Sequence, residues 1–189
     1  MQSFPSMARI FTRKLSARWA PALYFVLGQV GWFACVLGAA RGMAYLGIAL
    51  VLLLILLHVL RAERPALEVK LVATVVLIGG AWESALVCFG LLAYPHSTVI
   101  RGVAPWWLFA LWGLFAAQFN TTYRWLKSRV MAGALLGAFA GPLSFHAGAS
   151  LGAVRFVKVV PATVSLALGW AVLLPLIIML SRRWDGMEH

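Results

Sequence analysis

The chain has 189 residues, of which 63% are hydrophobic and 11% are charged, and its mean hydropathy is +0.92. A soluble core of this length cannot bury so much apolar surface, so we expect lipid to surround the protein and no room for a soluble catalytic domain. The net charge is +11, but the cations form no basic stripe and no nucleic-acid-binding motif. We therefore expect membrane lipids, and no nucleic acid, as partners.

The predicted elements follow one another with short loops. Residues 1–19 are basic, with apolar side chains near helical spacing, which predicts a short interfacial helix. Six apolar stretches follow, each close to the roughly 20 residues that cross a bilayer. We expect them to form one transmembrane domain over residues 20–181, with a cytoplasmic tail over 182–189. The spans lie at about 20–40, 43–60, 71–94, 105–125, 130–154 and 162–180.

The lysines and arginines sort to alternate sides of these stretches. One side holds only four: Arg41, Arg101, Arg155 and Lys158. The other side holds twelve: Arg9, Arg13, Lys14, Arg18, Arg61, Arg64, Lys70, Arg124, Lys127, Arg129, Arg182 and Arg183. Because cationic loops resist translocation, the richer side is expected to be cytoplasmic. The fold class predicted is an all-α bundle of six transmembrane helices with both termini in the cytoplasm.

Small residues indicate where the helices approach one another in lipid, because they let backbones come close. The fifth stretch carries a nearly continuous small ridge with one proline in it: Gly133, Gly137, Gly141, Pro142, Ser144, Gly148 and Gly152. We expect this helix to be central and to pack with the first and third helices.

Glu83 is an acid inside an apolar stretch. As the thirteenth residue of the predicted third span, it has about 18 Å of helix before it, which places it near the bilayer midplane. An unpaired carboxylate there costs on the order of 2.5–3.5 kcal/mol or more, so we expect it to be neutral, paired or facing a wet cavity. Gln29 in the first span is a candidate hydrogen-bond partner, and Ser84 lies beside Glu83 on the same helix. Glu83 is either a proton-handling or ligand-binding group or a structural carboxyl.

Three further polar residues complete the candidate pocket. Gln118 and Asn120 lie in the inner third of the predicted fourth span, where they either line a polar cavity or join helices by hydrogen bonds. His146 lies in the fifth span, on a different side from the small ridge, which favours a structural role.

No motif for nucleophilic, phosphate or metal chemistry occurs in the chain, and Cys35 and Cys88 have no second cysteine at metal-ligand spacing. We therefore expect no metal, no cofactor and no catalytic residue.

Several segments resemble a bacterial membrane family known as domain of unknown function 2878. They include residues 29–33, 83–84, 90–92, 104–107, 111–112 and, most specifically, the glycine-proline segment 137–144 with 147–148 and 151–153. The resemblance covers about residues 21–180. Glu83 stands where the family usually has an aspartate, which keeps the carboxyl but lengthens its reach. The resemblance implies no activity, and only a loose link to fatty-acid or envelope lipid modification.

Three functions remain open. The first is a non-enzymatic component of the bacterial inner membrane that binds a lipid, a partner membrane protein or a second copy of itself. The second is a small proton-coupled transporter that uses Glu83. The third is a lipid-active membrane enzyme, which is disfavoured because no reactive pair is visible in the sequence.

Overall fold

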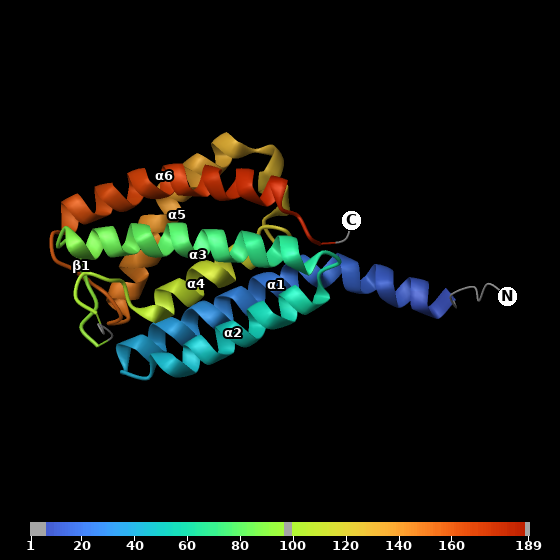
Figure 1. Ribbon diagram of the computed structural model, residues 1–189, viewed down its shortest axis with the longest axis horizontal. Coiled ribbons are helices and arrows are strands. Elements are labelled where there is room, and N and C mark those ends of the chain that lie inside the picture. The colour runs from blue at the N-terminus through green and yellow to red at the C-terminus, as the bar shows by residue number, and fades with distance from the viewer. Residues whose placement is uncertain (1–6, 97–99, 188–189) are drawn as a thin grey trace.

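The computed structural model describes residues 7–96 and 100–187, and this part of the chain is mostly helical (Figure 1). The helices are α1 Met7–Ala40, α2 Ala44–Arg61, α3 Pro65–Cys88, α4 Trp106–Ala117, α5 Val130–Ser150 and α6 Val159–Arg183. A short 3-10 helix, η1 Arg124–Ser128, lies between α4 and α5, and two short strands are β1 Leu92–Ala93 and β2 Arg155–Phe156.

Five of these helices are long and apolar enough to cross a membrane, and α4 is a shorter apolar helix. These are the features of a multi-pass membrane protein. The predicted interfacial helix continues without interruption into the first span, because α1 is a single helix that includes Pro21. Residues 1–6 of that prediction, and residues 188–189 of the predicted tail, lie outside the described residues.

The two ends of the molecule differ. The N-terminal part of α1 and the C-terminal end of α6 lie at one end of the bundle, and α1 extends beyond it (Figure 1). At the opposite end, β1 pairs antiparallel with β2, with Leu92 opposite Phe156. This small sheet joins the loop after α3 to the loop after α5. We call the two ends the terminal end and the sheet end.

The helix α4 is shorter than the predicted span over 105–125. Its 12 residues rise about 18 Å, which is less than the thickness of a bilayer core. A run of amide and hydroxyl side chains follows, and the Thr121 hydroxyl donates to the carbonyl of Gln118 at 3.3 Å. Such side chains compete with helical hydrogen bonds, so the helix gives way to turns at this point.

The chain still runs the length of α3 despite the short helix. Before α4, the Ala104 N–H donates to the Ser84 hydroxyl at 3.1 Å, near the sheet end of α3. After α4, Asn120 donates to Glu68 at 2.7 Å, in the first turns of α3. The segment 104–120 therefore lies antiparallel to α3 from end to end.

The centre of the bundle is α4, not α5 as the small-residue ridge predicted. α4 packs against α1, α2 and α3, whereas α5 packs mainly against α6. α4 is apolar on every face, which is typical of a buried helix. A small ridge permits close approach but does not specify the partner, and here the partner of Gly137 and Gly141 is Trp170 of α6.

Gly152 does not belong to this ridge. It follows the end of α5 with a backbone φ of 88°, a left-handed conformation that glycine adopts readily. Its place in the sequence repeat is therefore explained by the turn before β2. The helix itself continues through Pro142, which is buried.

Candidate functional site

A cavity of about 510 Å³ lies between α1, α4 and α5. It falls within the range of roughly 300–1,000 Å³ that is usual for small-molecule sites. Because α1 and α5 flank it without packing on each other, its rim includes outward-facing side chains, such as Leu143, which is 70% exposed, and Leu136, which is 41% exposed. We call this cavity the groove.

The floor of the groove is aromatic and is provided mainly by α4. Trp112 stacks on Trp170 of α6 with ring centroids 4.8 Å apart and planes 17° apart, and Phe115 meets Trp170 edge to face. From Trp107 to Gln118, the lining extends about 16 Å along the helix axis. The groove is therefore elongated along α4, and it suits an elongated apolar molecule.

Glu83 lines the groove and is fully buried. The indole of Trp112 lies close to its carboxyl, but within the described residues neither oxygen makes a hydrogen bond of normal geometry. The predicted bond from Gln29 is thus not formed, although Gln29 lines the same cavity. The predicted midplane position also changes, because α3 ends at Cys88 and Glu83 lies only about 8 Å from that end.

The other predicted pocket residues divide between the groove and elsewhere. Gln118 and Ser144 line the groove with Glu83 and Gln29, and the Gln118 side chain packs closely on Gly28 of α1. Ser84 instead donates to the carbonyl of Gly80 at 2.7 Å and accepts from the loop before α4. It holds the backbone at the sheet end and takes no part in the lining.

His146 also lies away from the groove. Its Nε2 is 3.0 Å from the hydroxyl of Thr163 on α6, and its ring stacks on Phe156 of β2 with centroids 4.3 Å apart. These contacts join α5, α6 and the small sheet. They fit a structural histidine.

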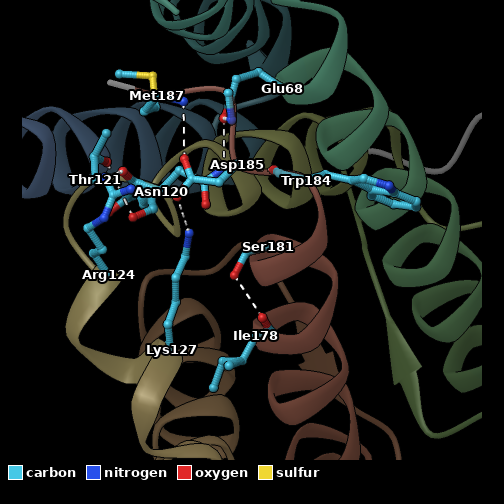
Figure 2. A network of polar contacts seen from close by, with 12 residues as sticks. Glu68, Asn120, Thr121, Arg124, Lys127, Ile178, Ser181, Trp184, Asp185 and Met187 are labelled. Atoms are coloured by element: carbon cyan, nitrogen blue, oxygen red, sulfur yellow. Dashed lines mark hydrogen bonds and ion pairs between the residues drawn. The ribbon is translucent and has the colours of Figure 1, made fainter. Parts of the chain in front are cut away.

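Asn120 belongs to a second polar cluster, at the terminal end, which the sequence reasoning missed (Figure 2). Its centre is Glu68, whose Oε2 is 2.8 Å from Nε2 of His58 and whose Oε1 accepts from Asn120 at 2.7 Å. All three side chains are buried, with 1% or less of their surface exposed. Glu68 and His58 lie on either side of the short connection between α2 and α3, and this spacing is the signal in the sequence that could have found them.

The C-terminal segment after α6 closes this cluster (Figure 2). The N–H of Gly186 donates to Oε1 of Glu68 at 2.7 Å, and its carbonyl accepts from the Arg64 N–H at 3.0 Å. Asn120 also donates to the carbonyl of Trp184 at 3.0 Å. Glu68 therefore fastens the end of the chain to the start of α3, and we call these contacts the tail lock.

Asp185 adds an ion-pair site beside the tail lock. Its Oδ2 accepts from Arg124 at 2.5 Å and from Lys127 at 2.7 Å, both on η1. Burial raises the pKa of Asp185, but the hydrogen bonds and charges of Lys127 and Arg124 outweigh it, so the pKa lies below its ordinary value. Burial also lowers the pKa of Lys127, a change that the contact with Asp185 opposes.

A comparison with protein-family models matches residues 21–176 to the family described as protein of unknown function (DUF2878). The chain belongs to this family. Comparisons with curated proteins and with solved structures gave no match.

The residues of this DUF2878 protein that match the family, 21–176, include the whole groove but only part of the tail lock. Every lining residue, from Gly28 to Leu174, falls within the matched range, whereas Trp184, Asp185 and Gly186 follow it. Over the described residues, no three His, Cys, Asp or Glu side chains gather closely enough to hold a metal ion. The groove is therefore the principal candidate for a functional site.

Proposed function

We propose that the protein is a non-enzymatic lipid-binding component of the bacterial inner membrane and that the groove between α1 and α5 is its binding site. The observation that carries this proposal is the shape of the groove. It is an apolar trough of about 510 Å³, and exposed apolar side chains form part of its rim. A hydrocarbon chain that leaves the bilayer sideways between α1 and α5 would meet the aromatic floor of α4 without crossing a polar barrier.

The same proposal takes the chain as six passes with both termini in the cytoplasm. The antiparallel course of segment 104–120 along α3 supports the sixth pass, although α4 alone is short. The charge distribution supports the orientation, because the cation-rich loops belong to the terminal end. A link to lipid modification would follow if the bound lipid were the substrate of a partner enzyme.

The composition of the lining gives less support to transport and to catalysis. Glu83 supplies the one carboxyl of the lining and Tyr123 a phenol, and among the described lining residues there is no histidine, lysine or arginine. A proton relay needs a second group that titrates near neutral pH, whereas a phenol ordinarily titrates near pH 10. A serine nucleophile such as Ser144 needs a base. Lipid binding needs neither.

The test is photo-crosslinking in lipid nanodiscs with a diacylglycerol and a phospholipid that each carry a diazirine in an acyl chain, followed by peptide mass spectrometry. The Ala140→Phe variant fills the groove from its rim and is expected to lose most labelling of peptides from α4. Ala132→Phe is the matched control, because Ala132 is exposed on the same helix and does not line the groove. Labelling of α4 that is equal in both variants and the wild type would reject the proposal.

A further inference from the structure

Four side chains that line the groove have buried polar atoms without hydrogen-bond partners in the described structure. They are both carboxyl oxygens of Glu83, Oε1 of Gln118, and the indole nitrogens of Trp107 and Trp170. Buried polar groups are normally paired, because leaving one without a hydrogen bond destabilises the protein. All four side chains line the same cavity, so a ligand bound there would supply hydrogen bonds that the protein lacks.

The kinds of atoms left unpaired define the polar part of that ligand. The two indole N–H groups can only donate, so they require an acceptor oxygen. Glu83 is least costly in an apolar site when it is uncharged, and an uncharged carboxyl both donates and accepts. A head group with a hydroxyl and ester carbonyls satisfies all of these groups.

The charges around the groove exclude other head groups. A phosphate would enter a water-poor site that contains a carboxyl and no lysine, arginine or histidine in its lining, so its charge would stay unpaired. The cations of the sheet end, Arg41, Arg101, Arg155 and Lys158, are exposed and do not line the groove. At the terminal end, Arg124 and Lys127 are engaged by Asp185. A quaternary ammonium would suit the aromatic rings but would leave both indole donors without an acceptor.

The position of Glu83 sets the direction of the ligand. Glu83 lies near the sheet end of α3, and Trp107 lies in the first turn of α4 at the same end. From there the aromatic floor leads about 16 Å towards Gln118. The polar head is therefore held at the sheet end, and the acyl chain lies along α4.

We propose that the groove selects an uncharged glycerolipid with a free hydroxyl, of the diacylglycerol class, through hydrogen bonds to Glu83 and the indoles of Trp107 and Trp170. This inference rests on the proposed lipid-binding function and adds the class of lipid. The selection for this lipid class depends on the buried side chains of Glu83, Trp107 and Trp170, not on the exposed rim of the groove.

The experiment is native mass spectrometry of the full chain in detergent, with diacylglycerol, phosphatidylglycerol and phosphatidylcholine of the same acyl chains in competition. We expect the wild type to prefer diacylglycerol by about tenfold, the effect of roughly one lost hydrogen bond or unpaired charge. Glu83→Gln, which keeps a neutral group that donates and accepts, should retain this preference. Glu83→Leu should abolish it.

The outcomes separate the lipid class from the lipid site. Equal binding of the three lipids, unchanged in Glu83→Leu, would overturn the head-group inference and leave the groove as a lipid site. A preference for phosphatidylcholine that both variants lose would show that Glu83 is charged and pairs with ammonium, which also overturns it. If no lipid is retained and Ala140→Phe changes nothing, the proposed function fails as well. Ala132→Phe serves as the control with an unaltered groove.

Discussion

Helix α3 carries two buried glutamates whose surroundings are opposite. Glu68, in the first turns, accepts hydrogen bonds from Asn120 and Gly186 and lies against His58, so both of its oxygens are paired. Glu83, four turns later, is equally buried, but within the described residues its carboxyl lies near the Trp112 indole and makes no hydrogen bond of normal geometry. Burial alone therefore does not identify a functional acid. A satisfied carboxyl holds the structure together, whereas an unsatisfied one beside a cavity is available to a ligand.

The largest expected effect that separates the two acids is the loss of Glu68. Glu68→Leu leaves His58, Asn120 and the Gly186 N–H buried without their partner, and we expect a loss of roughly 3–5 kcal/mol in the free energy of unfolding. Glu83→Leu removes an unpaired polar group and should change that free energy by about 1 kcal/mol or less. Denaturant titration in detergent, followed by tryptophan fluorescence, measures both. Equal losses in the two variants would show that Glu83 is structural too.

A smaller effect distinguishes the two amides at the end of α4. Asn120→Leu removes the donor to Glu68 and to the Trp184 carbonyl, with an expected loss of about 1–3 kcal/mol. Gln118→Leu keeps similar volume in the groove and removes an unpaired oxygen, so its stability should stay close to that of the wild type. Limited proteolysis of the C-terminal segment gives a second readout. If Gln118→Leu released this segment as readily as Asn120→Leu, the separation of groove and tail lock would be wrong.

The smallest effect concerns the ion pairs of Asp185 with Arg124 and Lys127. Because the folded pKa of Asp185 lies below its ordinary value of about 3.9, its contribution to stability is present above that pH and is lost as the pH falls through the folded pKa. Arg124 is about one-third exposed, so solvent screening keeps the effect within about 1 kcal/mol.

Hydrogen exchange of the Met187 amide, which donates to Asp185 at 3.1 Å, should report this loosening. Asp185→Asn should exchange faster at neutral pH and lose the acid dependence. A wild type whose exchange protection stays the same from pH 5 to pH values well below the ordinary carboxyl pKa of about 3.9 would contradict the assignment.

The amino-acid sequence by itself determined the class of protein and the family, and it singled out Glu83 as a candidate site residue. Long apolar stretches encode membrane helices locally, so α1, α2, α5 and α6 were recognised close to their positions, whereas α3 begins and ends six residues before the predicted span. An acid in such a stretch stands out without any structure. The predicted fourth span extended beyond the end of α4, because hydropathy does not show where amide and hydroxyl side chains end a helix.

Only the tertiary structure decided the central place of α4, the pairing of α5 with α6 and the tail lock. Glu68 meets Asn120 across 52 positions of the chain and Gly186 across 118, and neither separation leaves a periodic signal. The glycines of α5 predicted a close helix contact but did not identify the partner, because small residues allow close packing with any helix. Hydropathy and residue spacing along the chain predict which residues are removed from water, and three-dimensional packing determines which of these residues contact one another.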